Sequence, residues 1–217
     1  MKYIEERNQL IEYGRKMSQD SLSPGTSGNL SIFLREEKLL LISPSGMDYF
    51  NIEPEDLVLM DLDGKIIEGK RKPSCEWQLH TNFYKAKADI GALVHTHSLN
   101  CACLAAMRMP IEAVHYVIGD ANTNKVMCSP YYRFGTEKLA RAAVETCGRA
   151  KAVLLANHGL VTCGKDLEAA YSLAKNLEYV AEIQVKTMSM GRPYILNKKE
   201  MDQVIQGFKG YGQGTEE

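Results

Sequence analysis

Three histidines in two short segments have the spacing of a catalytic metal site. His95 and His97 are separated by one residue in VHTHS, and residues two apart on a strand point to the same face, so both imidazoles can bind one ion from one side. His158 follows an apolar segment and precedes a glycine in LLANHGL, as a residue presented at a strand end would. Three histidines with one open position are typical of catalytic zinc, whereas structural zinc usually has four protein ligands.

A second interpretation of His95 and His97 is a pair of partly buried side chains bonded to backbone carbonyls. Glu76, an acid expected near the three histidines, favours the metal interpretation. A carboxylate in the first turn of a helix also interacts favourably with the helix dipole, so its position alone assigns no function. Histidine ligands also accept cobalt, nickel or manganese. We interpret His80 and His115 as structural.

The elements that must position these residues are strands interleaved with helices, which indicates a layered α/β domain. We expect a strand at Ile90–Thr96, which carries the two spaced histidines, and a helix at Glu76–Lys87 with Ser74 as its N-cap. The other expected strands are Leu30–Leu34, Lys38–Ile42, Leu57–Asp61, Ala113–Ile118, Ala152–Ala156 and Leu160–Thr162. The other expected helices are Tyr3–Met17, Leu99–Met107, Thr136–Cys147, a long helix capped by Asp166 and running towards Met190, and Lys199–Phe208.

The composition is that of an ordinary globular protein. The chain has 217 residues, 45% of them hydrophobic and 24% charged, with a formal net charge of -1. The sequence has no run of Lys or Arg of the kind that binds nucleic acid. It also has no apolar run of the roughly 18 residues that a membrane span needs. Six cysteines without a CxxC pair are interpreted as reduced thiols. We therefore expect a cytoplasmic protein.

Seven short motifs occur in one order along the chain, and together they resemble the L-fuculose-1-phosphate aldolases of the class II aldolase/adducin family. The motifs are GTSGNLS at 25–31, SPSGMDY at 43–49, PSCEW at 73–77, VHTHS at 94–98, VHYVIG at 114–119, NHGL at 157–160 and FKGYG at 208–212. The resemblance implies that residues 1–217 form a single three-layer α/β/α domain with a central, mainly antiparallel sheet. It also implies a homotetramer with active sites between subunits.

The resemblance further implies a role for each matching residue. His95, His97 and His158 would hold one Zn2+ per subunit, with Glu76 able to approach the metal and act as acid and base. Tyr116 would contact the oxygen on C4, and Tyr211 would close over the site. The substrate phosphate would be bound by Gly28, Asn29, Ser45, Gly46, Ser74 and Cys75. Cys75 departs from the family pattern, which has a second serine there, and a thiol is a weaker donor than a hydroxyl.

The reaction implied is the reversible cleavage of L-fuculose 1-phosphate, a sugar phosphate, to dihydroxyacetone phosphate and L-lactaldehyde. The wider family leaves alternatives open: an aldolase or dehydratase for another 5-deoxy or methylthio pentulose 1-phosphate, or a ribulose-phosphate 4-epimerase, although relatives of the last kind carry Asp where this chain has Glu76. A non-enzymatic alternative is a metal-binding module that has lost turnover. The alternative interpretation of the two tyrosines is ordinary packing. The alternative interpretation of the small residues expected to bind phosphate is that they form turns.

Overall fold

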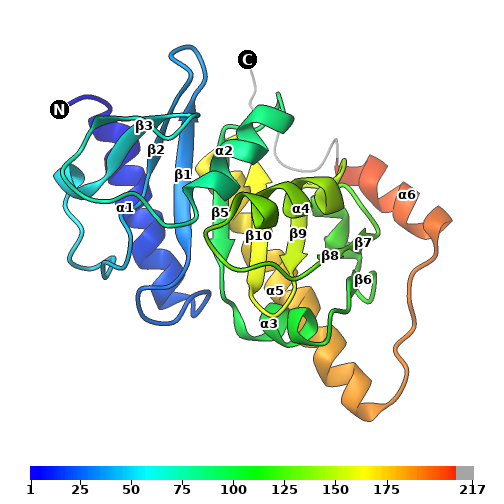
Figure 1. The fold of residues 1–217 in the computed structure, drawn as a ribbon. Helices are drawn as coiled ribbons and strands as arrows, with labels where there is room; N and C mark the ends of the chain where they lie inside the picture. The colour runs from blue at the N-terminus through cyan, green and yellow to red at the C-terminus, as the bar shows by residue number, and fades with distance from the viewer. Residues whose placement is uncertain (209–217) are drawn as a thin grey trace, which may run out of the picture.

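The protein is described by a computed structural model, in which residues 1–208 are placed (Figure 1). One eight-stranded sheet runs through the centre of the molecule in the order β4-β3-β2-β1-β5-β10-β9-β8. Every neighbouring pair in it is antiparallel except β8 and β9, which are parallel. The prediction of a central, mainly antiparallel sheet is therefore confirmed. A separate two-stranded sheet pairs β6 with β7.

The bounds of the elements agree closely with the expected segments. The strands of the large sheet are β1 (Asn29–Leu34), β2 (Leu39–Ile42), β3 (Val58–Asp61), β4 (Ile66–Glu68), β5 (Ala92–Thr96), β8 (Cys128–Ser129), β9 (Ala152–Leu155) and β10 (Gly159–Gly164), and those of the small sheet are β6 (Ile111–Glu112) and β7 (Lys125–Val126). The α-helices are α1 (Ile4–Gln19), α2 (Trp77–Ala86), α3 (Leu99–Ala106), α4 (Glu137–Cys147), α5 (Leu167–Met190) and α6 (Lys198–Phe208). Two short 3-10 helices are η1 (Pro54–Asp56) and η2 (Tyr116–Ala121).

Helices cover both faces of the sheet, because the strands are apolar on both sides. Alternate residues of β5 divide between two cores: Ala92 and Val94 pack with α1, α3 and α5, whereas Leu93 packs with α2 and α4. The same period of two divides β9 and β10. His95 has the parity of Leu93, so it points to the face covered by α2, the helix that follows Glu76. The three-layer architecture thus decides which residues can meet the histidines.

The predicted strand Ala113–Ile118 is wrong. Residues 113–115 form a bend after the short strand β6, and residues 116–118 belong to the 3-10 helix η2, in which Ile118, Gly119 and Ala121 are buried. Two or three buried side chains on one face of a tight turn give the same local pattern as an alternating strand. The short strands β4, β7 and β8 carry too few residues for a period of two to be recognised and were not predicted.

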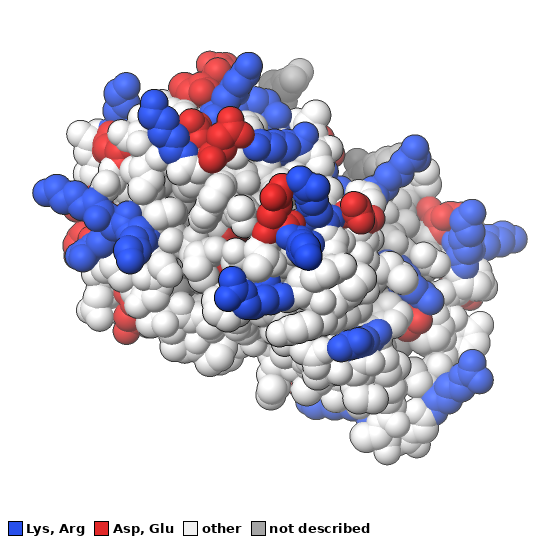
Figure 2. Space-filling view, viewed as in Figure 1, with Lys and Arg blue, Asp and Glu red and all other residues white. Residues whose placement is uncertain are grey.

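Charged side chains are dispersed over the visible surface, with Lys and Arg interspersed among Asp and Glu (Figure 2). This face therefore presents no basic stripe of the kind that binds a nucleic-acid backbone. Among residues 1–208, no helix has the length and apolar character needed to cross a membrane.

Candidate metal centre

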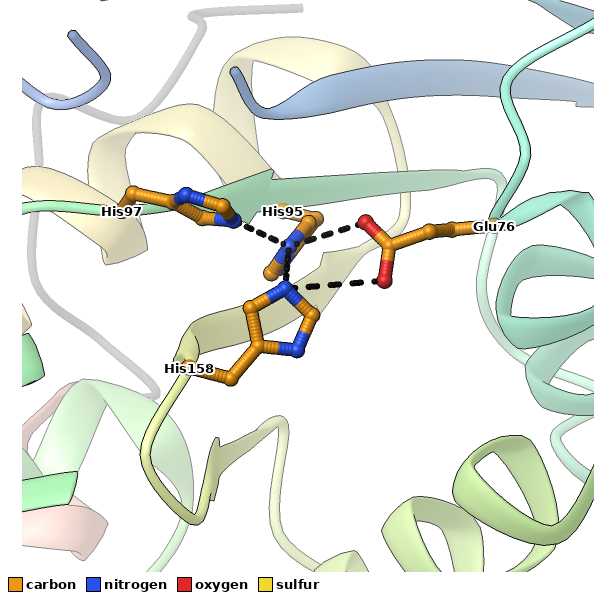
Figure 3. Close-up of side chains that lie close together, drawn as sticks. All are labelled: Glu76, His95, His97 and His158. Carbon is orange, nitrogen blue, oxygen red and sulfur yellow. Dashed lines mark hydrogen bonds and ion pairs between the residues drawn. The ribbon is translucent and has the colours of Figure 1, made fainter. Parts of the chain in front are cut away.

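The four residues predicted to surround a metal come together on the α2/α4 face of the sheet. His95 lies in β5 and His97 just beyond its end, while His158 lies in the turn between β9 and β10. Glu76 comes from the loop before α2. The three imidazoles point towards one another and the carboxylate faces them (Figure 3). These are the only His, Cys, Asp and Glu side chains within residues 1–208 that cluster closely enough to hold an ion.

The β9–β10 turn is shaped by two local constraints. Asn157 adopts a left-handed backbone conformation with φ of 54°, which Asn tolerates better than most residues, and its N–H donates to the Ala105 carbonyl at 3.0 Å. Gly159 follows because a Cβ there would lie 2.2 Å from the Thr96 carbonyl oxygen. The motif NHGL is therefore explained by the close approach of this turn to β5, which brings His158 to the other histidines.

Glu76 is positioned by a turn that differs from the expected helix start. The helix α2 begins at Trp77, and Glu76 itself is the N-cap residue, with no capping hydrogen bond from its side chain. The prediction of Ser74 as N-cap is therefore wrong. The Ser74 hydroxyl instead accepts the Glu76 N–H at 3.2 Å. This frees the Glu76 carboxylate to turn towards the histidines.

The distances within the group are short. His95 Nε2 lies 2.9 Å from His97 Nε2 and 3.3 Å from His158 Nε2. Glu76 Oε2 is 3.2 Å from His95 Nε2, and Glu76 Oε1 is 3.6 Å from His158 Nε2. The three rings are mutually edge-on, with all centroids 4.8 Å apart. The arrangement aims one nitrogen of each ring at a common point.

The charges of the group are set by burial and by one ion pair. Burial and the neighbouring His95 lower the pKa of His97 to about 3 and that of His158 to about 4, so both rings are neutral. Burial alone would lower the pKa of His95 and raise that of Glu76. Their mutual attraction outweighs burial: the pKa of His95 is raised, and that of Glu76 lies well below its ordinary value.

These residues fit a divalent metal. His95 Nδ1 lies 2.9 Å from the Leu160 carbonyl oxygen, so Nδ1 donates and Nε2 is left to bind an ion. Nitrogens about 2.0–2.1 Å from a tetrahedral zinc ion are about 3.3 Å from one another, close to the separations found here. Glu76 Oε1 is buried and has no hydrogen-bond partner among the described residues. A cation among the four side chains would satisfy that oxygen.

Metal affinity is expected to increase with pH through the neutral range. A proton on His95 competes with the metal for Nε2, and the pKa of this ring is raised above the ordinary 6.5. Below that raised pKa each metal ion must displace the proton, so the apparent affinity falls about tenfold per pH unit as the pH decreases. Competition with a chelator of known proton affinity, measured on both sides of the ordinary histidine pKa, checks this. An affinity that does not change with pH contradicts it.

A cavity of about 360 Å³ opens beside the metal ligands. Glu76, His97 and His158 line it. All six residues predicted to bind phosphate also line it: Gly28, Asn29, Ser45, Gly46, Ser74 and Cys75. They come from loops far apart in the sequence.

Backbone hydrogen bonds hold two of these loops side by side. Ser74 N–H donates to the Ser43 carbonyl at 3.0 Å, and Ser45 N–H donates to the Lys72 carbonyl at 3.0 Å. Gly46 has φ of 67°, so the turn requires a glycine-like conformation. Burial and the nearby Glu76 raise the pKa of Cys75, and its side chain therefore stays a thiol. The loops place small polar groups around one end of the cavity.

Three aromatic residues in the cavity wall were not singled out from the sequence. Tyr131, Tyr132 and Phe134 lie in the loop between β8 and α4 and line the cavity, although each is partly exposed to solvent. The signal was present: SPYYRFGT is an aromatic cluster in a Pro- and Gly-containing loop, where apolar side chains have no helix or strand face to pack on.

Of the two tyrosines expected near the substrate, the structure describes Tyr116, and it does not bring this residue to the cavity of its own chain. Tyr116 lies at the start of η2, where it is 53% exposed and its ring stacks on Phe208. It does not line the cavity. Tyr211 lies outside the described residues. His80 and His115 do not belong to the metal group. His80 is fully buried, and both of its ring nitrogens are hydrogen-bonded.

Comparison with known families decides the relationship of this chain. Residues 8–185 match the class II aldolase and adducin N-terminal domain. The chain belongs to this family. Two aldolases match it over nearly its whole length.

The chain is 45% identical over 208 residues to 5-deoxy-D-ribulose 1-phosphate aldolase of Bacillus thuringiensis serovar kurstaki. This alignment covers 96% of the chain and 97% of the relative.

A second relative and a solved structure agree with this class II aldolase assignment. The chain is 38% identical to 5-methylthioribulose-1-phosphate/5-deoxyribulose-1-phosphate aldolase of Rhodospirillum rubrum, over 97% of this chain and 94% of the relative. A solved L-fuculose 1-phosphate aldolase superposes with a TM-score of 0.94 at 38% identity, covering 96% of this chain and 98% of that one. Aldolase (lyase) activity and a metal requirement follow from the family and from the four-residue group.

Proposed function

We propose that the protein is a zinc-dependent aldolase that reversibly cleaves a ketose 1-phosphate between C3 and C4, giving dihydroxyacetone phosphate and a short aldehyde. The observation that carries this proposal is the shared cavity, which is lined both by Glu76 and two of the three clustered histidines and by small polar residues from three loops. We further propose that residues 1–217 form one domain and act in the cytoplasm in carbohydrate metabolism.

The side chains would divide the reaction between them. His95, His97 and His158 would hold the zinc ion, which acts as a Lewis acid that stabilises negative charge on the C2 carbonyl oxygen. Glu76 would transfer the proton at C3, delivering it during cleavage and removing it during condensation. Its side chain is 5% exposed and lines the cavity, so the carboxylate is held in one place beside the substrate while it can still exchange its proton with solvent between turnovers.

The phosphate would be bound at the end of the cavity formed by the three small-residue loops. Backbone N–H groups of such turns can surround an anion. The Ser45 and Ser74 hydroxyls can add donors, and the Cys75 thiol adds a weaker one. Asn29 is directed differently: its amide donates to Glu76 Oε2 at 3.0 Å. Its backbone and Gly28 remain available to the phosphate.

The aldehyde half of the substrate decides which ketose phosphate is used. The relatives are aldolases of 5-deoxyribulose, 5-methylthioribulose and L-fuculose phosphates. Cleavage of each between C3 and C4 leaves the same dihydroxyacetone phosphate, and each aldehyde ends in a methyl group. The rings of Tyr131, Tyr132 and Phe134 in the cavity wall suit such an apolar end.

We propose 5-deoxy-D-ribulose 1-phosphate, which yields acetaldehyde, as the preferred substrate. The support is the 45% identity to an aldolase of that substrate, against 38% to the solved L-fuculose 1-phosphate aldolase. This reverses the order expected from the sequence motifs. L-Fuculose 1-phosphate, which yields L-lactaldehyde in fucose degradation, is the second candidate, supported by the superposition at a TM-score of 0.94.

Assembly would complete the site. We propose a homotetramer in which Tyr116 and Tyr211 reach the cavity of a neighbouring subunit. Support comes from the position of Tyr116, whose half-exposed ring lies outside the cavity of its own chain. In that place its hydroxyl would hydrogen-bond the oxygen on C4, relaying to solvent the proton that this oxygen loses during cleavage and supplying it during condensation.

A substrate panel tests the proposed function. Zinc-loaded protein is incubated with 5-deoxy-D-ribulose, 5-methylthio-D-ribulose and L-fuculose 1-phosphates, and both products are identified. We expect dihydroxyacetone phosphate from at least the first, with kcat/KM about tenfold higher than for L-fuculose 1-phosphate, the discrimination typical of a small change in an apolar pocket. Loss of water without C–C cleavage would instead identify a dehydratase. Epimerisation of ribulose 5-phosphate would identify an epimerase.

A further inference from the structure

A chain of buried polar side chains runs from the candidate catalytic carboxylate into the α2 layer. Asn29 Nδ2 donates to Glu76 Oε2 at 3.0 Å, and Asn29 Oδ1 lies 2.5 Å from His80 Nε2. His80 Nδ1 lies 2.6 Å from Ser31 Oγ, which lies 2.6 Å from the Tyr84 hydroxyl. His80 and Ser31 have no exposed surface, and neither lines the cavity.

Strand pairing and helix periodicity together build this chain. Asn29 in β1 is the cross-strand partner of His95 in β5, which puts its amide beside the metal group. Ser31 is two residues further along β1 and points to the same face. His80 and Tyr84 are one helical turn apart on α2 and face the strand. The two pairs therefore meet along a line that ends at Glu76.

The hydrogen bonds of this chain can have only one direction. An ionised carboxylate only accepts, so Asn29 must turn its NH2 group to Glu76 and its Oδ1 to His80. His80 must then carry its proton on Nε2 and accept on Nδ1. The only remaining donor to Nδ1 is the Ser31 hydroxyl. Tyr84 in turn directs its single hydroxyl proton to Ser31, whose Oγ and carbonyl oxygen lie 2.6 Å and 3.0 Å away.

His80 is suited to this role because it carries one proton. Burial, assisted by the nearby His95, lowers the pKa of His80 to about 3. The ring therefore stays neutral across the neutral pH range, with one donor and one acceptor nitrogen. A protonated ring would donate from both nitrogens, so the Ser31 hydroxyl would have to turn its proton from His80 to the Tyr84 oxygen.

We infer that His80 is a positioning residue for Glu76: it fixes the orientation of the Asn29 amide, so that Oε2 always faces an N–H donor and a proton taken up by Glu76 resides on Oε1. Glu76 Oε1 makes no hydrogen bond among the described residues, so it is the oxygen that can carry a proton whenever the carboxylate does not bind the metal. If Asn29 rotated by a half-turn, its Oδ1 would accept a proton from Oε2, and the carboxylic acid would hold that proton away from the substrate. This inference rests on the proposed aldolase function.

Kinetic variants of the full-length, zinc-loaded protein test the inference. H80L removes the bond to Asn29 and is expected to lower kcat by about 10- to 100-fold, the usual cost of losing a residue that orients a metal-site ligand. KM should not change, because His80 does not line the cavity. H80Q should restore most of kcat, since its amide can donate to Asn29 and accept from Ser31. Wild-type kcat in H80L overturns the inference.

A matched variant on the same helix separates positioning from packing. Like H80L, Y84F removes a buried polar group from α2. Unlike H80L, it leaves the Ser31 hydroxyl proton directed to His80. We expect lower thermal stability with unchanged kcat. Equal losses of kcat in Y84F and H80L would show a general packing effect and overturn the inference. If H80L does not fold, S31A replaces it, with a smaller decrease in kcat expected, because Nδ1 loses its donor; unchanged kcat in S31A counts against the inference.

A spectroscopic measurement separates this inference from the proposed function. A long-range 1H–15N correlation spectrum of the metal-free protein should show His80 with a protonated Nε2 and an unprotonated Nδ1 across the neutral pH range. A protonated Nδ1 overturns the inference whatever the substrate. Failure of the wild-type protein to cleave any ketose phosphate in the panel would reject the proposed function, while the spectrum would still decide whether His80 fixes the Asn29 amide.

Discussion

Replacing Glu76 by Gln is expected to lower kcat for ketose phosphate cleavage by about 10²- to 10⁴-fold, the usual contribution of a general acid or base. The amide has the shape of the carboxylate and can still accept the Asn29 N–H, but it cannot carry a proton to C3. The three histidines remain, so bound zinc should be retained. Exchange of the C3 proton of dihydroxyacetone phosphate with deuterated water, followed by NMR, should slow by a similar factor.

Glu178 supplies a matched control for this substitution. Its carboxylate accepts the backbone N–H groups of Asn100 and Cys101 at 2.9 Å and so caps α3, away from the cavity. E178Q should lower thermal stability and leave proton exchange at the wild-type rate. Wild-type exchange in E76Q, with zinc still bound, would remove Glu76 from the proposed role.

Replacing His158 by Ala is expected to remove both the metal and the activity. It leaves two histidines and one carboxylate, and since loss of an orienting neighbour alone costs about 10–100-fold in metal affinity, loss of a ligand should cost at least about 100-fold. After dialysis against a weak chelator, elemental analysis should find zinc in the wild-type protein and almost none in the variant. Cleavage should fall to background.

Two comparisons make the result for His158 specific. His115 lies outside the metal group, where its Nδ1 accepts the Val117 N–H at 3.3 Å, so H115A should keep its zinc. Stripping the wild-type protein with a strong chelator should abolish cleavage, and added zinc should restore it. A metal-free H158A protein that cleaves at the wild-type rate would contradict a role for the metal in catalysis.

The sequence was most informative where local periodicity and the site coincide. The apolar segment of β5 predicts a buried strand, the spacing of two predicts the common face of His95 and His97, and the structure brings His158 and Glu76 to these histidines. The strand before His158 and the long helix capped by Asp166 also agree, and the Asp166 side chain accepts the Ala169 N–H at 2.8 Å. These elements depend on neighbours in the chain, which a sequence pattern records.

Features that depend on distant segments were not predictable. The contact between Asn29 and Glu76 requires that β1 pair with β5 in one register, and nothing local in either strand specifies that pairing. The aromatic wall formed by Tyr131, Tyr132 and Phe134 depends on where an irregular loop folds back. Ser74 was assigned to the wrong role because a serine before a helix can bond the backbone at more than one position.

The placement of β5 between β1 and β10 has a consequence for biosynthesis. The fourth ligand, His158, is made last on the ribosome and reaches the others only when the β9–β10 hairpin docks on β5. A nascent chain or a proteolytic fragment that ends before β9 carries an incomplete ligand set. Tight binding of the ion therefore requires that synthesis has passed this hairpin and that the central strands have paired.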